Sequence, residues 1–405
     1  MTALTLLVVG EGHPDTWDCW SGCARGLVTA LRRAGVHVVG RDADLYGLRR
    51  LATAVMSWSQ PRARWAARYH CGALGFAARS GRAHAGFRGV AFDAVLQIGA
   101  TFDALRYTRR PGFLYCDANC RLAQRYAPYG DVPALRPAEI DRMAAREGRV
   151  YERAATIFTM SEYARRSFLQ DFSVPEDRVT TVHAGANLDA TSPAARSPRR
   201  DGPPTVLFVG RLWERKGGPM LLKAFHRVRQ ACPEARLRIV GATPAVGDEP
   251  GVEVVGSVNK AAPGGQAKLL QLYETADVFC MPSRYEPFGT VFAEAMLHGL
   301  PCVAANHCAM PEIIEDGRSG WLVPDGDVTA LAHCLTRILA DRGALAAAGA
   351  RARERALQLF TWDRVAERML AVMKAGALQA VVDRESSGHA PPRSGEPLAR
   401  SSATR

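Results

Sequence analysis

The sequence lacks any apolar run long enough to cross a membrane, because Arg, Gly or Pro interrupts each run well before the ~18 residues that a span needs. The first residues, MTALTLLVVGEG, contain neither a basic segment nor a small-residue cleavage site. We therefore expect them to form a buried strand rather than a secretion signal. These absences favour a cytoplasmic protein.

Cysteine pairs of the C-x2-C kind are absent, although the chain has ten cysteines. Cys19/Cys23 and Cys116/Cys120 are spaced C-x3-C, and neither is followed by the second pair that a zinc site needs. We expect most of the thiols to be reduced and buried as small hydrophobic groups.

Lysine is scarce, because only five of the 52 basic residues are lysine and 47 are arginine. The formal net charge is +12 and the pI is about 9.5. Arginine suits phosphate and carboxylate partners through its planar fork. A GC-rich genome produces the same bias, and we attribute most of the arginines to it. We expect no nucleic-acid partner.

The chain has 405 residues, of which 47% are hydrophobic and 23% are charged, and this is enough for two soluble globular domains. Strand-sized apolar runs such as TLLVVG and TVLFVG alternate with helical patterns in both halves. Such alternation is typical of parallel sheets with helices on both faces. We predict an α/β fold of two doubly wound, Rossmann-like domains that face each other across a cleft, with ligands at the carboxyl ends of the strands.

Changes in composition along the chain mark the expected domain boundaries. We predict an N-terminal domain over 1–190, a linker rich in Pro, Ser and Arg over 191–204, and a C-terminal domain over 205–358. An amphipathic helix is expected over 359–376, and the polar tail over 383–405 is expected to be disordered.

The segment Met56–Arg88 interleaves arginines with Trp58, Trp65, Tyr69 and Phe76. A basic aromatic helix can lie on an anionic membrane surface. Alternatively, a helical insertion packs its aromatic rings inward and leaves its arginines in solvent. We favour inward packing of the aromatic rings and keep peripheral membrane contact as the alternative.

The sequence EPFGTVFAEAMLHG predicts a buried helix over about 288–298, with Pro287 in its first turn and a C-terminal stop at Gly299. The free N–H groups at the start of such a helix, together with its dipole, form an anion site. Gly289 allows a phosphate to approach the backbone closely.

Two glutamates, Glu286 and Glu294, have seven residues between them in this segment. Glu294 lies among apolar neighbours, and a buried carboxylate needs a hydrogen-bonding partner. Ribose hydroxyls of a bound nucleotide and a nearby arginine are both suitable partners, and the spacing leaves the two readings open.

The sequence VGRLWERKGG follows an apolar strand and places Arg211 and Lys216 in a loop before a helix. A guanidinium and an ammonium at the carboxyl end of a strand suit a diphosphate leaving group. In isolation the two side chains would more often be solvated, but an anion-binding helix start in the same domain favours a functional role.

Three segments of the second half resemble the GT-B retaining glycosyltransferases of family 4: GRLWERKG, SRYEPFGTVFAEAMLHGLPCVA and PEIIEDGRSGWLV. They contain the G-R-x4-K-G loop, a Pro-Ser pair with the E-x7-E pair, and the P-E-I-I-x-D-G motif in the family's order. In the first half WSGCARGLVTALRRAG and SEYARRSFLQDFSVPEDRVTTVHAGAN resemble the family more weakly. The resemblance implies the GT-B fold and a last helix that returns to the N-terminal domain.

The resemblance also implies roles for the matching positions. The groups that hold the diphosphate of the donor are the side chains of Arg211 and Lys216 and the backbone of Phe288, Gly289 and Thr290. Glu286 contacts the donor sugar and Glu294 the ribose. Ser21 and Gly22 form a loop near the donor phosphates and the acceptor. No metal ion or other cofactor is implied, because protein cations and the helix dipole stabilise the leaving group.

Two positions depart from the family pattern. Many members carry a histidine after a central strand of the N-terminal domain, where this chain has LYCDAN with Asp117. Asp117 can position the acceptor hydroxyl or take its proton, but it can equally be a helix N-cap. At the domain junction the chain has HAGAN, in which we expect His183 to be structural.

The sequence therefore predicts a retaining hexosyltransferase that moves a glycosyl group from a nucleotide-diphosphate sugar to an acceptor hydroxyl. The catalytic candidates are Arg211, Lys216, Glu286 and Asp117. The acceptor classes are a sugar, a lipid-linked sugar or a small molecule, which fits polysaccharide or glycoconjugate biosynthesis, in the cytoplasm or at the inner face of the membrane.

Two other functions fit the same fold: a sugar phosphorylase or synthase, and a non-catalytic protein that binds sugar nucleotides. The complete glutamate and cation sets argue against the second. A nicotinamide oxidoreductase is disfavoured, because the first turn, GEGHPD, lacks the G-x-G-x-x-G sequence.

Overall fold

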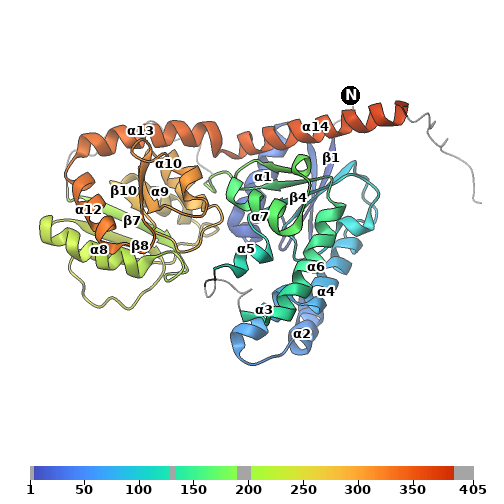
Figure 1. Cartoon of the computed structure of the whole chain (residues 1–405), viewed down its shortest axis with the longest axis horizontal. Coiled ribbons are helices and arrows are strands. Elements are labelled where there is room, and N and C mark those ends of the chain that lie inside the picture. Colours follow the sequence, from blue (N-terminus) through green and yellow to red (C-terminus); the bar gives the residue numbers. More distant parts are fainter. Residues whose placement is uncertain (1–3, 127–128, 130–133, 189–201, 387–405) are drawn as a thin grey trace, which may run out of the picture.

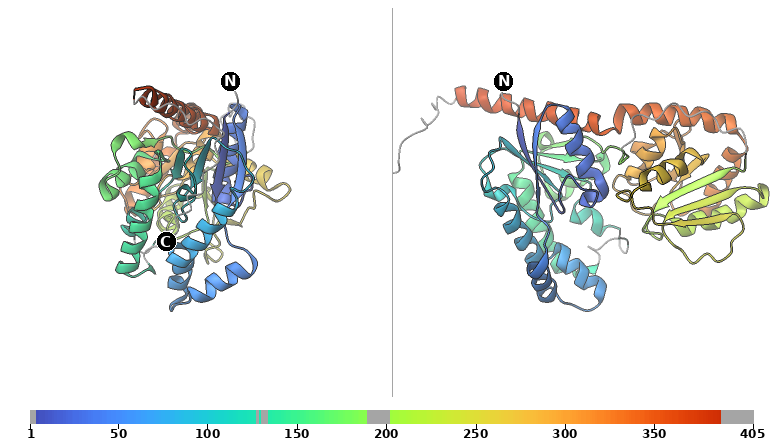
Figure 2. Two further views of the ribbon diagram at one scale, coloured as in Figure 1. Left: turned by 90° about the vertical axis from the view of Figure 1, so that its right-hand side faces the viewer. Right: turned by 180° about the vertical axis from the view of Figure 1, so that it is seen from behind.

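Two parallel six-stranded sheets form the centres of two domains in the computed structural model (Figure 1). The structure describes residues 4–126, 129, 134–188 and 202–386, with 376–386 as backbone alone. The N-terminal domain lies on the right of Figure 1 and the C-terminal domain on the left, and two further views show the same arrangement (Figure 2).

The N-terminal sheet has the strand order β2-β1-β3-β4-β5-β6. Its strands are β1 (Thr5–Gly10), β2 (His37–Asp42), β3 (Ala94–Ile98), β4 (Gly112–Cys116), β5 (Thr156–Thr159) and β6 (Val179–Thr181). Side chains of β1 alternate between two hydrophobic clusters on opposite faces of the sheet. Leu6 and Val8 join one cluster, and Leu7 and Val9 join the other. This is why a continuous apolar run forms a strand covered on both sides.

Helices cover both faces of this sheet. They are α1 (Cys23–Arg33), α2 (Gly47–Met56), α3 (Arg62–Cys71), α4 (Ala73–Ala85), α5 (Cys120–Gln124), α6 (Pro137–Arg153) and α7 (Glu162–Phe172). Ser161 caps α7 by accepting a hydrogen bond from the backbone N–H of Ala164 at 3.0 Å, as its sequence position predicts.

The C-terminal sheet has the order β12-β11-β10-β7-β8-β9. Its strands are β7 (Thr205–Gly210), β8 (Arg236–Gly241), β9 (Val252–Gly256), β10 (Val278–Cys280), β11 (Cys302–Ala305) and β12 (Gly320–Val323). The helices around it are α8 (Gly218–Ala231), α9 (Gly265–Glu274), α10 (Thr290–Leu297), α11 (Met310–Ile313), α12 (Val328–Leu339) and α13 (Arg342–Leu359).

The strand order reverses between β1 and β3 in the first sheet and between β7 and β10 in the second. In doubly wound sheets, a crevice opens outside the carboxyl ends of the strands at such a reversal. The loops that follow β1, β3, β7 and β10 are therefore the places where ligand-binding side chains are expected.

The last helix, α14 (Trp362–Ser386), runs from the C-terminal domain along the N-terminal domain, at the top of Figure 1. Its Trp362 indole N–H donates to Asn187 Oδ1 at 3.0 Å. The indole fits this place only because Gly26 and Gly185 have no side chain, since a Cβ on them would lie 2.2 and 2.5 Å from it. The prediction of a disordered tail over 383–405 is wrong for its first residues, because α14 continues to Ser386.

Two further sequence expectations concern residues that the structure does not describe. The linker predicted over 191–204 is described only from Gly202, and the tail beyond Ser386 lies outside the described residues. The domain boundaries placed in these segments stay predictions.

Contacts between the two domains bring their loops together. Glu312 of α11 accepts hydrogen bonds from the backbone N–H groups of Glu162 and Tyr163 at the start of α7, at 2.6 and 2.5 Å. The Ser161 hydroxyl donates to the carbonyl of Pro287 at 2.7 Å. The P-E-I-I motif thus caps a helix of the other domain.

The basic aromatic segment Met56–Arg88 begins at the last residue of α2 and forms α3 and α4. Helices α2 to α4 lie at the lower end of the N-terminal domain in Figure 1. Trp65, Tyr69 and Phe76 are partly buried, but Trp58 is 60% exposed, so the favoured inward packing holds only in part. Leu48 and Val55 of α2 are 84% and 62% exposed. Among the described residues, no helix has the length and hydropathy required to span a membrane.

Candidate active site

A cavity of about 590 Å³ lies between the two domains, at the carboxyl ends of β1, β3, β4 and β10. The predicted site residues that line it are Ser21, Asp117, Lys216, Glu286, Phe288, Gly289 and Thr290. Gly22, Arg211 and Glu294 are not among the lining residues, although Gly22 directly follows Ser21.

Helix α10 begins at Thr290, two residues later than predicted. Gly289 is its N-cap and has φ +88°, a left-handed conformation that cannot continue back into the helix. Pro287 and Phe288 therefore lie in the preceding loop rather than in the first turn. Thr290 and Val291, the first two residues of the helix, both line the cavity, so the positive end of its dipole faces this space.

Lys216 and Glu286 form an ion pair at the wall of the cavity. Their side chains are 12% and 6% exposed, and Arg215 lies 3.8 Å from the same carboxylate. Burial lowers the pKa of Lys216, the Glu286 charge opposes this, and the positive charges of Arg215 and Arg211 lower it further. A cation and an anion thus face the cavity side by side.

Backbone geometry places Lys216 at the cavity. Gly217 has φ +74°, and a Cβ on it would lie 1.8 Å from the carbonyl oxygen of Pro282. The backbone N–H of Arg284 donates to the carbonyl of Arg215 at 2.8 Å. These contacts join the loop after β7 to the loop after β10, and only glycine at position 217 permits this approach.

Arg211 is exposed at the end of β7. It is close enough for its charge to lower the pKa of Lys216, but its side chain does not line the cavity. Its proposed role as a diphosphate ligand therefore stays a prediction.

Glu294 is fully buried in α10, and protein groups occupy both of its carboxylate oxygens. Lys260 Nζ lies 2.5 Å from Oε1, and the Tyr273 hydroxyl donates to Oε2 at 3.0 Å. Lys260 also donates to the carbonyl of Asn187 at 3.1 Å. The internal ion pair considered from the sequence exists in this structure, but its cation is a lysine and not an arginine.

Asp117 follows β4 and lines the cavity on the N-terminal side. The helix N-cap is Asn119 instead, because its Oδ1 accepts the N–H of Leu122 at 2.9 Å. The capping alternative for Asp117 is therefore wrong. Burial raises the pKa of Asp117, backbone N–H groups oppose this, and the charge of Glu286 raises it further.

The loop that contains Ser21 and Gly22 has an unusual backbone. Trp20, Ser21 and Gly22 all have positive φ, at 49°, 54° and 91°. The Trp17 ring fills the space at Gly22, where a Cβ would lie 2.5 Å from it. The Ser21 carbonyl accepts a hydrogen bond from Asn187 Nδ2 at 3.1 Å, which fixes the loop to the domain junction.

His183 occupies the domain junction rather than the cavity. Its Nδ1 lies 3.2 Å from the carbonyl of Met160, and its ring stacks near Phe288, with ring centres 6.2 Å apart. Burial lowers the pKa of His183 to about 4, and the charge of Arg368 lowers it further. Its position fits the structural role expected from the sequence.

Sequence reasoning missed several residues of the site. Glu11, Trp20 and Glu147 line the cavity. Asn187 contacts Ser21 from outside it, and Lys260 pairs with Glu294. Glu11 directly follows β1 at the point where the strand order reverses, which was the signal that could have revealed it. Lys260 lies in a loop whose sequence gave no comparable indication.

Within the described part of the chain, no group of three or more His, Cys, Asp or Glu side chains could hold a metal ion. The D-x-D sequence after β12 has other contacts, because Asp325 pairs with Arg284 at 3.1 Å and Asp327 caps α12. All ten cysteines are free thiols, and six of them are buried.

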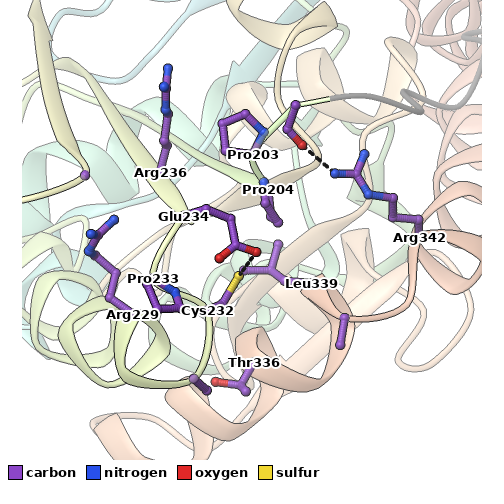
Figure 3. A pocket seen from close by; sticks show the side chains of 14 residues that line it. Pro203, Pro204, Arg229, Cys232, Pro233, Glu234, Arg236, Thr336, Leu339 and Arg342 are labelled. Atoms are coloured by element: carbon purple, nitrogen blue, oxygen red, sulfur yellow. Dashed lines mark hydrogen bonds between the residues drawn. The ribbon is translucent and has the colours of Figure 1, made fainter.

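A second cavity, of about 1030 Å³, lies at the amino ends of strands in the C-terminal sheet (Figure 3). Its lining includes Pro204 before β7, Arg236 at the start of β8 and the Cys232–Glu234 hydrogen bond. Ligands of doubly wound sheets bind at the carboxyl ends of strands, and this cavity is at their amino ends. The smaller cavity between the domains is therefore the candidate active site.

A family model described as "Glycosyl transferases group 1" matches residues 203–341, which contain β7 to β12 and the loops of Lys216 and Glu286. The C-terminal domain therefore resembles the group 1 glycosyl transferases over these residues. The resemblance predicted from the sequence motifs is confirmed there.

Curated relatives align with about half of the chain. A D-inositol 3-phosphate glycosyltransferase from Streptomyces avermitilis is 33% identical over 243 residues, covering 55% of this chain and 52% of the relative. An alpha-maltose-1-phosphate synthase from Mycolicibacterium smegmatis is 29% identical over 257 residues, covering 56% and 65%. The chain spans about half the length of the first curated relatives it matches.

Solved structures show the fold over nearly the whole chain. A sucrose-phosphate synthase from Thermosynechococcus elongatus has a TM-score of 0.69 at 20% identity and covers 93% of this chain and 100% of its own. HepE from Anabaena, in complex with UDP and glucose, has a TM-score of 0.62 at 18% identity and covers 92% and 100%. The predicted GT-B fold of two doubly wound domains is confirmed.

Proposed function

We propose that this protein is a retaining glycosyltransferase that moves a glycosyl group from a nucleoside-diphosphate sugar to an acceptor hydroxyl. The observation that carries the proposal is the cavity between the domains. On one side it has Lys216, Glu286 and the start of α10, and on the other it has Asp117. The relatives and neighbours named above fit this activity, and HepE binds UDP and glucose.

The donor side is suited to a departing diphosphate. The Lys216 ammonium and the dipole of α10 face the cavity, and Arg211 adds positive charge nearby. In a partly buried site, preorganised positive charge of this kind stabilises negative charge that develops on the leaving group. We propose that these groups do this without a metal ion or another cofactor.

Binding of the donor would either separate Lys216 from Glu286 or add the donor as a further partner of both side chains. In this proposal the diphosphate takes the Lys216 ammonium, and the freed Glu286 carboxylate accepts hydrogen bonds from hydroxyls of the donor sugar. Each charge of the ion pair thus gains a new partner of the opposite polarity, so neither is left buried and unpaired.

The acceptor enters from the N-terminal side, where Asp117 and Ser21 line the cavity. Asp117 orients the acceptor hydroxyl. The bond from its oxygen to the anomeric carbon forms on the face from which the diphosphate leaves, and the hydroxyl proton passes to the departing phosphate oxygen. Attack on the same face retains the anomeric configuration.

The experiment is a thermal-shift screen of the full chain with nucleoside diphosphates and nucleotide sugars, followed by a transfer and hydrolysis assay with each stabilising donor. We expect Lys216→Ala to lower turnover by about 100-fold or more, because one charge-stabilising group is lost. The exposed Lys268→Ala is the matched control. Turnover of the Lys216 variant close to that of the wild type would refute the role of this lysine.

The same screen separates the alternatives. A sugar phosphorylase requires inorganic phosphate and gains no stability from a nucleoside diphosphate. A non-catalytic binding protein is stabilised by the nucleotide sugar but neither transfers nor hydrolyses it. Several relatives have a phosphorylated sugar or cyclitol in their names, which makes phosphorylated acceptors the first class to compare with uncharged ones.

A second proposal concerns an anionic membrane surface as a binding partner, at the inner face of the cell membrane. Leu48, Leu51 and Val55 of α2 share one helix face and are 84%, 61% and 62% exposed. Trp58 follows at 60%, and the exposed Arg49 lies beside them. Exposed apolar side chains next to arginines suit an interface that contains anionic lipids.

Sedimentation with vesicles tests this proposal. We expect the chain to bind vesicles that contain phosphatidylglycerol more strongly than pure phosphatidylcholine, and Leu51→Ser with Val55→Ser to abolish most of this binding. The control is Val254→Ser on β9, where an apolar residue is 38% exposed in the other domain. Equal binding of the wild type and the double variant would refute the proposal.

A further inference from the structure

The N-terminal side of the active-site cavity carries acidic side chains. Glu11, Asp117 and Glu147 all line it, and they come from the loop after β1, the loop after β4 and helix α6. Among the described residues of this lining, Lys216 is the one basic side chain, and it belongs to the C-terminal domain and pairs with Glu286.

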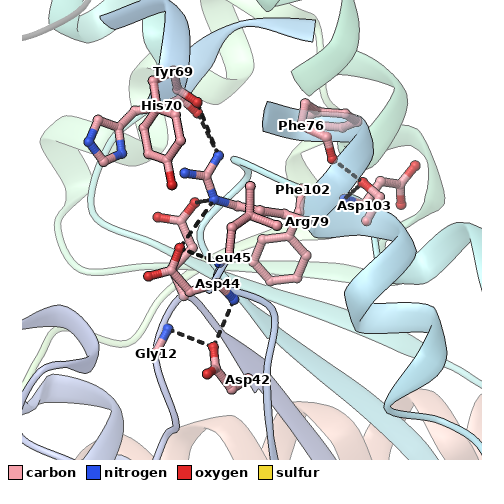
Figure 4. A network of polar contacts seen from close by, with 12 residues as sticks. Gly12, Asp42, Asp44, Leu45, Tyr69, His70, Phe76, Arg79, Phe102 and Asp103 are labelled. Atoms are coloured by element: carbon pink, nitrogen blue, oxygen red, sulfur yellow. Dashed lines mark hydrogen bonds and ion pairs between the residues drawn. The ribbon is translucent and has the colours of Figure 1, made fainter. Parts of the chain in front are cut away.

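An ion pair with Arg79 holds Glu11 in place. Figure 4 shows Arg79 beside Asp44 and His70. Arg79 of α4 is 1% exposed, and its Nε lies 2.8 Å from Glu11 Oε1 and 3.8 Å from Asp44. It also donates to the carbonyl of His70 at 3.1 Å. One guanidinium therefore faces two carboxylates, so the formal charge of these three side chains together is negative. The Glu11 side chain remains 26% exposed, whereas Arg79 does not line the cavity.

Glu147 is a buried carboxyl group that lines the same side. Its Oε2 accepts hydrogen bonds from the backbone N–H of Cys120 at 3.0 Å and from the Tyr151 hydroxyl at 2.9 Å. Burial raises the pKa of Glu147, as it does for Asp117. A phosphate group beside these carboxyl groups would raise both pKa values further, so bringing a phosphate here carries an electrostatic cost.

Trp20 adds an apolar surface to this acidic wall. Its ring lies beside the loop after β3, where a Cβ on Gly99 would be 3.1 Å from it. It lines the cavity together with Thr101. An aromatic face beside carboxylates offers apolar contact for the C–H groups of a sugar and acceptors for its hydroxyl protons.

We infer that the acceptor is an uncharged or positively charged polyhydroxylated molecule, such as an unphosphorylated sugar, cyclitol or amino sugar, and not a phosphorylated one. The inference rests on the proposed function, whose acceptor class it names. Hydroxyl and ammonium groups donate hydrogen bonds, and the carboxylates of this wall accept them. A phosphate offers only acceptors and negative charge at neutral pH, and like charges repel.

The experiment compares acceptors that differ by one phosphate, for example inositol with inositol phosphate and glucose with glucose 6-phosphate. Binding to the full chain is measured by ligand-observed NMR, and transfer is measured with the donor identified in the thermal-shift screen. We expect the unphosphorylated member of each pair to be favoured by about ten-fold or more.

Charge removal gives the second arm of the test. Glu11→Gln keeps the shape and the hydrogen-bonding capacity of the side chain but removes its charge. It should reduce the preference for the uncharged acceptor several-fold. Glu176→Gln, an exposed carboxylate of the same domain, is the control and should leave this preference unchanged.

The outcomes separate the two proposals. Donor hydrolysis together with a preference for phosphorylated acceptors overturns this inference and leaves the proposed function intact. If no nucleotide sugar is bound or hydrolysed, the proposed function fails, and the NMR series alone decides the inference. Preferential binding of the phosphorylated members, or binding of neither member, overturns it.

Discussion

Replacing Lys260 by alanine should have opposite effects on stability and on nucleotide binding. Lys260 lies 2.5 Å from Glu294 Oε1, and the Glu294 side chain is 1% exposed whereas the lysine is 21% exposed. Removing the ammonium leaves a buried carboxylate whose remaining side-chain partner among the described residues is the Tyr273 hydroxyl. Breaking a buried ion pair in this way costs about 3 kcal/mol or more.

The expected loss can be measured as a melting temperature. For a domain of this size, 1 kcal/mol corresponds to roughly 2–4 °C, so we expect the Lys260→Ala variant without ligand to melt about 6–12 °C lower. If ribose hydroxyls bind Glu294, they must displace Lys260 in the wild type and need not do so in the variant. The variant should then bind the nucleoside diphosphate roughly ten-fold more tightly.

The assay is calorimetric titration of both proteins with the nucleoside diphosphate that stabilises the wild type best, together with thermal unfolding at saturating ligand. Lys268→Ala provides the control, because this lysine is exposed on the adjacent helix α9. Weaker nucleotide binding by the Lys260 variant would refute competition between lysine and ribose. An unchanged melting temperature would refute the importance of the buried pair.

The remaining predictions concern two other positions. Gly217→Ala should lower both stability and turnover, because its Cβ would lie 1.8 Å from the carbonyl oxygen of Pro282. Gly264 has a similar φ of +75° but open space around it, so Gly264→Ala should cost only the roughly 1–2 kcal/mol of backbone strain. If both variants lower the melting temperature equally, the close approach of residue 217 to the Pro282 carbonyl is refuted. Burial lowers the pKa of His183 to about 4 in the folded chain. As the pH falls, the unfolded chain therefore binds a proton at this histidine before the folded chain does. The free energy of unfolding should decrease by up to about 3 kcal/mol between about pH 6.5 and pH 4. His183→Asn, which tolerates the φ of +64°, should lack this loss in urea titrations at pH 7 and pH 4.5, and an identical pH dependence would contradict the assignment.

The strands and the order of the motifs were predictable because they depend on local patterns. The runs TLLVVG and TVLFVG form β1 and β7 over the residues expected, since continuous apolar residues fit strands that are buried on both faces. The start of α10 was less predictable. Pro287 favours a first turn, but Gly289 has a left-handed conformation and the helix begins only after it, and a Cβ at Gly289 would meet Phe292 and Glu286 at 2.9 and 3.0 Å.

The sequence by itself determined the two-domain α/β architecture, the resemblance to glycosyl transferases and the two loops that carry Lys216 and Glu286, because each depends on residues that are close together along the chain. Only the tertiary structure decided which distant groups meet. Lys260 reaches Glu294, Arg79 holds Glu11, and Asn187 joins Trp362 to the Ser21 loop across long separations in sequence. These partners are set by strand order and domain packing, and no local pattern encodes them.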